Sequence, residues 1–75
     1  MYEIKGTGWC PYCQEAKDLL NSLNKEVVFV DLDEVPEKAL EMIEQGMKTI
    51  PQIYHNGNRV GGYEDLKQYI EALCD

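Results

Sequence analysis

Residues 2–30 read YEIKGTGWCPYCQEAKDLLNSLNKEVVFV, and this stretch determines the class of fold. Its first segment, Tyr2 to Lys5, is short and alternating, which is typical of a strand. After a glycine-containing loop, apolar residues recur at helical spacing from Ala16 to Leu23, and Asn24 is the predicted end of this helix. The continuous β-branched and aromatic run from Val27 to Val30 predicts a strand that is buried on both faces. A strand, a helix and a strand in this order form a βαβ unit.

The rest of the chain predicts a helix, a hairpin and a final helix. The first of these two helices is expected to open near Pro36 and to stop at Gly46. Its predicted core-facing residues are Ala39, Leu40, Ile43 and Met47. Asn56-Gly57 is a strong signal for a tight turn between antiparallel strands at 52–55 and 58–60. The final helix is expected to pack through Leu66, Tyr69, Ile70 and Leu73.

The element order is therefore β-α-β-α-β-β-α, which predicts a single α/β domain over residues 1–75. Three helices are expected to flank a four-stranded mixed sheet, with the first two strands parallel and the last two antiparallel. A chain of 75 residues has room for only one core. Spacing alone does not fix the order of the strands within the sheet.

Composition and charge exclude several classes of function. Fourteen acidic residues against seven basic ones give a net charge of −7, the wrong sign for binding nucleic acid or an anionic membrane. The longest apolar run, Val27 to Val30, is far shorter than the roughly 18 residues of a membrane helix, and the first residues do not form a signal peptide. We therefore expect a cytoplasmic monomer without nucleic-acid or membrane partners.

The cysteines predict chemistry rather than structural disulfides, because three are too few for a disulfide-stapled domain and cannot all pair. Cys10 and Cys13 stand where a loop after a strand enters a helix. We expect the Cys10 sulfur to be exposed at the helix N-terminus, where unpaired N–H groups favour a thiolate. Cys13 falls on the core-facing side, so we expect its thiol to be less accessible and to lie within reach of Cys10 as the resolving partner.

Such a pair can exchange disulfides without a metal or a tightly bound cofactor. The Cys10 thiolate attacks a disulfide and forms a mixed disulfide, which Cys13 or an external thiol then resolves. A zinc site is the alternative, but the pair supplies only two of the four ligands that zinc usually takes. Cys74 and His55 are poor candidates for the missing zinc ligands, because Cys74 is distant in the sequence and His55 flanks a turn. Redox chemistry is therefore favoured over zinc binding.

Three motifs, in order, resemble those of the glutaredoxins, a family of the thioredoxin-fold superfamily. They are Cys10-Pro11-Tyr12-Cys13, Thr49-Ile50-Pro51 and Gly61-Gly62-Tyr63-Glu64-Asp65, and the resemblance spans essentially the whole chain. The resemblance implies a thioredoxin-like fold and an enzyme that reduces protein disulfides and glutathione mixed disulfides, with glutathione as its reducing co-substrate. By family analogy alone, ribonucleotide reductase is a possible protein client.

The resemblance also assigns roles outside the cysteine pair. Pro11 and Tyr12 support the active site, and Pro51 follows a cis peptide bond that leaves the backbone of the preceding residue free to pair with substrate. From the residues alone, an ordinary trans proline that opens an edge strand is the preferred interpretation of Pro51. The implied glutathione-binding residues are Lys48, Thr49, Ile50, Gly62, Tyr63, Glu64 and Asp65. Lys48 is matched to the glycyl carboxylate, the amides of Tyr63 and Glu64 to the γ-glutamyl carboxylate, and Asp65 to the ammonium group. From the residues alone, Lys48 is equally a solvated lysine, and Glu64 and Asp65 are equally helix caps.

Thr7 departs from the family pattern, in which a lysine or arginine often stands three residues before the first cysteine. This departure leaves open a glutaredoxin-like redoxin that is reduced by thioredoxin reductase. A further alternative is a non-enzymatic carrier, in which two chains share an iron–sulfur cluster through Cys10 and glutathione. Pro11 counts against it, because family members that hold clusters usually have a smaller residue there.

Overall fold

A computed structural model describes residues 1–46 and 49–73, and its elements follow the predicted order. The strands are β1 (Tyr2–Gly6), β2 (Val27–Asp31), β3 (Gln52–His55) and β4 (Asn58–Gly61). The helices are α1 (Pro11–Ser22), α2 (Pro36–Glu44) and α3 (Tyr63–Leu73). The predicted fold class, a thioredoxin-like α/β fold with a four-stranded mixed sheet, is confirmed. None of the helices described is both long and apolar enough to cross a membrane.

The sheet has the strand order β2-β1-β3-β4, which the sequence did not predict. In the middle of the sheet, β1 runs parallel to β2 and antiparallel to β3, with Ile4 opposite Ile53. The predicted hairpin of β3 and β4 is confirmed, because Asn56 and Gly57 at its turn have φ of 51° and 87°. Positive φ also occurs at Asn24, just after α1, and at Gly46, just after α2, so both predicted helix ends are confirmed.

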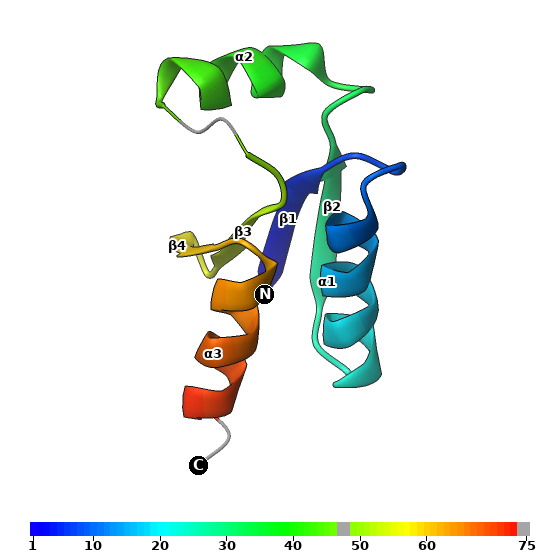
Figure 1. The fold of residues 1–75 in the computed structure, drawn as a ribbon, viewed down its shortest axis with the longest axis vertical. Coiled ribbons are helices and arrows are strands. Elements are labelled where there is room, and N and C mark those ends of the chain that lie inside the picture. The colour runs from blue at the N-terminus through cyan, green and yellow to red at the C-terminus, as the bar shows by residue number, and fades with distance from the viewer. Residues whose placement is uncertain (47–48, 74–75) are drawn as a thin grey trace.

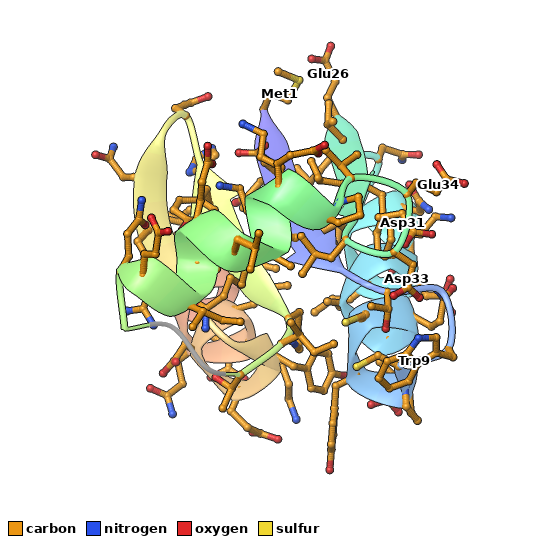
Figure 2. The ribbon with its side chains drawn as sticks, turned by 90° about the horizontal axis from the view of Figure 1, so that it is seen from above. Met1, Trp9, Glu26, Asp31, Asp33 and Glu34 are labelled. Carbon is orange, nitrogen blue, oxygen red and sulfur yellow. The ribbon has the colours of Figure 1, made fainter. Side chains whose placement is uncertain are left out.

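Helices lie on both sides of the sheet. In Figure 1, α1 and α3 lie side by side against one side of the sheet, and Figure 2 shows α2 crossing over the strands from the opposite side. The hydrophobic core lies between the sheet and the pair α1 and α3. Its buried members are Tyr2, Ile4, Ala16, Leu20, Ile53, Leu66 and Ile70. The even-numbered residues of β1 face this core, since successive side chains of a strand point to opposite faces.

The opposite face of the sheet is covered less completely, which corrects two predictions. The run at β2 is not buried on both faces, because β2 is an edge strand and Val28 is exposed. On α2, Leu40 and Ile43 are exposed rather than core-facing, and Met42 is the buried residue. The less exposed positions of this segment are Val35, Ala39 and Met42. They repeat at helical spacing, as the predicted residues do, but on a neighbouring face of the helix. The fourth predicted core residue of this helix, Met47, lies outside the described residues.

The ends of α1 and α3 are also less buried than their periodicity predicts. Leu66 and Ile70 are buried as predicted and Tyr69 is half-buried, but Leu73 at the end of α3 is exposed. Leu23, the C-cap of α1, is exposed as well. Both leucines lie at helix ends that extend past the core, so periodicity overestimates the length of the packed stripe.

Candidate active site

The first turn of α1 carries the two cysteines. Cys10 is the N-cap residue, and its sulfur accepts a hydrogen bond from the Cys13 backbone N–H at 3.4 Å. The Cys10 N–H in turn donates to the Thr7 carbonyl at 3.4 Å, which closes the loop before the helix. Pro11 occupies the first helical position, where its missing N–H leaves no hydrogen bond unmade. The predicted placement of the cysteine pair at a helix N-terminus is confirmed.

Cys10 is only 6% exposed, so the prediction that it is exposed is wrong. Its sulfur turns back over the first turn to meet the Cys13 N–H, instead of projecting into solvent. The exposed side chains at this point are the neighbouring aromatics, Trp9 at 72% and Tyr12.

Cys13 is fully buried against the end of β1, as predicted. A Cβ atom at Gly6 would overlap its sulfur, so glycine at this position makes room for the thiol. Burial, followed by the side-chain hydrogen bond with Cys10, raises the pKa of Cys13 to about 12, against the lowering effect of a backbone hydrogen bond with Thr7. Cys13 is therefore a neutral thiol near pH 7, which leaves Cys10 as the attacking residue of the pair.

The raised pKa of Cys13 predicts a loss of stability in alkali for the reduced protein. The ordinary pKa is 9.0, and the folded value is about 12. The unfolded chain thus releases this proton at lower pH than the folded chain, and the contribution to stability, complete below pH 9, is lost between pH 9 and 12. We expect the free energy of unfolding, measured with urea under reducing conditions, to fall more steeply in this window for the wild type than for Cys13→Ser. Parallel pH profiles of the two proteins would contradict this prediction.

A cavity of about 240 Å³ lies beside the first turn of α1. Its walls are Tyr12, the segment Thr49–Pro51 before β3, and the segment Gly62–Asp65 at the start of α3. The Ile50–Pro51 peptide bond is cis, as the resemblance implied. The fold thus brings together residues from all three motifs, although the cysteines themselves do not line the cavity. Lys48, the remaining residue implied in glutathione binding, lies outside the described residues.

The start of α3 forms one wall of this cavity. Leu66 N–H donates to the Gly62 carbonyl at 2.9 Å, and Asp65 Oδ2 accepts from the Gly62 N–H at 3.2 Å. Asp65 therefore caps the helix, one of the two interpretations left open by its sequence. Gly61 has φ of 126°, and a Cβ there would overlap the Asp65 carboxylate. Glycine at this position is required both by the backbone and by the side chain packed against it.

Comparison with known proteins identifies the family. The glutaredoxin family model matches residues 2–60, which is more than half of the chain. The chain belongs to the glutaredoxin family. The glutaredoxin of Pseudomonas aeruginosa PAO1 is 39% identical over 64 residues, which cover 84% of this chain and 76% of that protein. Glutaredoxin 3 of Escherichia coli K12 is 40% identical over 65 residues, which cover 85% and 78%.

Solved structures agree with this assignment. The buckwheat glutaredoxin–glutathione complex matches with a TM-score of 0.80 over 95% of this chain and 68% of that chain, at 20% identity. At this identity the likeness shows the fold. Family and fold together make the chain a thiol–disulfide oxidoreductase. The family match ends at Val60, so the segment Gly62–Asp65 is assigned to the site by the cavity rather than by that match.

Two features next to the cysteines were not predicted from the sequence. The Trp9 indole N–H donates to Asp33 Oδ2 at 2.9 Å, which ties the loop before α1 to the loop before α2 (Figure 2). These residues are 24 positions apart, and no spacing signal connects them. Thr7 is buried, and within 1–46 and 49–73 its hydroxyl has no hydrogen-bond partner. Its backbone, in contrast, contacts both cysteines.

His55 lies in a separate aromatic cluster rather than with the cysteines. Its ring stacks on Tyr2 at 4.1 Å between centroids, and its Nδ1 is 2.6 Å from the Tyr69 hydroxyl. Within the described part of the chain, no three His, Cys, Asp or Glu side chains come together in a way that could hold a metal ion. The half-buried His55 thus contributes to packing on the core face of β3.

Proposed function

We propose that the chain reduces glutathione mixed disulfides and protein disulfides, with glutathione as the reductant and without a tightly bound cofactor. The cavity beside the Cys10 turn is the observation that carries this proposal, because Thr49–Pro51 and Gly62–Asp65 converge there. The buckwheat glutaredoxin of the same fold is solved as a complex with glutathione, which supports the same ligand here.

Each polar group of glutathione has a suitable partner near this cavity. The N-terminus of α3, at Tyr63 and Glu64, suits the γ-glutamyl carboxylate, because its first N–H groups have no partner within the helix. Asp65 uses one oxygen for the Gly62 N–H and can offer the other to the ammonium group. The backbone beside the cis bond at Ile50 suits the cysteinyl peptide, and Lys48 is proposed for the glycyl carboxylate.

Reduction of a glutathione mixed disulfide requires only Cys10. Its thiolate attacks the glutathione sulfur, the Cys10–glutathione disulfide forms, and the client sulfur leaves as a thiolate that takes up a proton. A second glutathione thiolate attacks the glutathione sulfur of this intermediate and regenerates Cys10 while releasing oxidised glutathione. Cys13 takes no part in this cycle.

Reduction of a protein disulfide requires both cysteines. The Cys10 thiolate attacks one client sulfur and forms a mixed disulfide with it, while the other client sulfur leaves as a thiolate and takes up a proton. Cys13 then attacks the Cys10 sulfur, which forms the Cys10–Cys13 disulfide and releases the client sulfur that was bonded to Cys10. Because its pKa is raised, Cys13 gives up its proton as it attacks, and the departing client sulfur takes up a proton. Two glutathione molecules then reduce the Cys10–Cys13 disulfide.

A redoxin reduced by thioredoxin reductase is the second candidate function. The observation that favours it is Thr7, a buried residue at a position where the family often has a lysine or arginine. In either case we propose that the chain acts as a monomer in the cytoplasm, where reductant is abundant. Ribonucleotide reductase remains a proposed client by analogy with the family.

The two candidates differ in their source of electrons. The test is NADPH consumption with the mixed disulfide of glutathione and β-mercaptoethanol, supplied once with glutathione and glutathione reductase and once with thioredoxin reductase. We expect turnover in the first assay. Turnover with thioredoxin reductase alone would contradict the proposal and establish the second candidate.

A further inference from the structure

Gln52 is a buried polar residue directly after Pro51 that does not itself line the cavity. It is 2% exposed, and its side-chain amide is paired at both ends. Nε2 donates to the Thr49 carbonyl at 2.9 Å and lies 3.3 Å from the Thr49 hydroxyl, while Oε1 accepts from Arg59 Nε at 3.1 Å. A buried amide is costly unless it is paired in this way, so its orientation is fixed.

Arg59 determines which way the amide of Gln52 points. A guanidinium group only donates hydrogen bonds, so the amide oxygen must face Arg59. The NH₂ group is then left for the Thr49 carbonyl, which only accepts. The three residues therefore form a directed chain of hydrogen bonds from β4 through β3 to the segment before the cis bond.

The tight turn of the β3–β4 hairpin places Arg59 on the same face of the sheet as Gln52. The two-residue turn pairs His55 with Asn58 and Tyr54 with Arg59, and the bulge at Val60 lies beyond this pair. Arg59 therefore shares the face of Tyr54, and of Gln52 two residues away.

We propose that Gln52 is a positioning residue for glutathione binding, held in orientation by Arg59; this inference rests on the function proposed above. The Gln52 amide fixes Thr49 at one end of the cavity wall, and its own backbone continues from Pro51 at the other end. Ile50 is thereby held between two fixed points before the ligand arrives. A wall that is already ordered spares glutathione the entropic cost of ordering it.

The test compares the kinetics of Gln52→Met, Gln52→Glu and the wild type with the glutathione mixed disulfide. Methionine keeps the length of the side chain but no amide, whereas glutamate keeps an acceptor for Arg59 and loses the donor to Thr49. We expect both variants to raise KM about tenfold, as loss of a preorganising hydrogen bond would, and to change kcat less than about twofold, because Gln52 does not contact Cys10. Gln68→Met, an exposed position on α3, is the matched control and should leave both constants unchanged.

The outcomes separate the two proposals. A wild type without glutathione-dependent turnover would contradict the proposed function and this inference together. Normal wild-type turnover with an unchanged KM in Gln52→Glu, or a loss confined to kcat, would overturn this inference alone. Gln52→Glu retains a partner for Arg59, so its KM decides the test even if Gln52→Met does not fold.

Discussion

Cys10→Ser abolishes turnover of every disulfide substrate, whereas Cys13→Ser keeps the turnover of glutathione mixed disulfides and loses the reduction of protein disulfides. The asymmetry follows from the first turn of α1. Burial and the hydrogen bond with Cys10 raise the pKa of Cys13, which keeps Cys13 a neutral thiol near pH 7 and leaves the attack to Cys10. Serine at position 10 is a much weaker nucleophile and a poor leaving group, and we expect a loss on the order of a thousandfold or more.

Two substrates measured side by side test this asymmetry. The glutathione–β-mercaptoethanol disulfide reports on Cys10 alone, and an insulin disulfide reports on the complete pair. We expect Cys13→Ser to retain most of the first activity and to lose the second. Equal losses with both substrates would show that Cys13 is needed for every cycle, contrary to its role as a resolving thiol for protein disulfides only.

Leu20→Ala and Leu40→Ala make the same chemical change on two helices, with very different expected costs. Leu20 on α1 is 0% exposed within the core, while Leu40 on α2 is 60% exposed. Removal of a buried leucine side chain costs about 2–5 kcal/mol, because the transfer free energy is lost and a cavity remains. At about 0.05–0.15 kcal/mol per residue, a domain of this size has few kcal/mol to lose, so Leu20→Ala should be close to unfolding at 37 °C.

Urea denaturation of the two variants beside the wild type gives the comparison. For Leu40→Ala the free energy of unfolding should change by less than about 0.5 kcal/mol, as at other exposed positions. A large cost at Leu40 would mean that α2 packs in the register expected from the sequence rather than in the one observed. Similar small costs at both positions would contradict the placement of the core between the sheet and the pair α1 and α3.

Local patterns predicted the elements of this fold well because each element has a local signal. In the part of the chain that the structure describes, periodicity located the helices and β1, a continuous apolar run located β2, and Asn56-Gly57 located the hairpin of β3 and β4. The errors concern what covers each element. Val28 and Leu40 are apolar and correctly spaced, but Val28 lies on the face of the sheet that the short helix α2 covers incompletely, and Leu40 lies on the exposed side of α2 itself. Spacing shows which residues share a face, and only the arrangement of layers shows whether that face is buried.

In the candidate site, too, the sequence predicted the features that a local motif marks and missed those that depend on long-range contacts. The three motifs supplied the cysteine pair, the cis bond and the start of α3, and the fold brings them to one cavity. Long-range pairings left no signal in the sequence, as the Trp9–Asp33 hydrogen bond shows. Gln52 is a clearer case, because its role depends on side-chain hydrogen bonds with Thr49 and Arg59, which no local pattern predicts.

Trapping the glutathione intermediate is the sharpest test of Cys10 as the nucleophile that accepts glutathione. Cys13→Ser, incubated with oxidised glutathione and analysed by intact mass and peptide mapping, cannot resolve a mixed disulfide formed at Cys10. We expect one glutathione per chain on the peptide that contains Cys10, and its loss on addition of reduced glutathione. No adduct at Cys10, or an adduct on Cys74 instead, would contradict this role for Cys10.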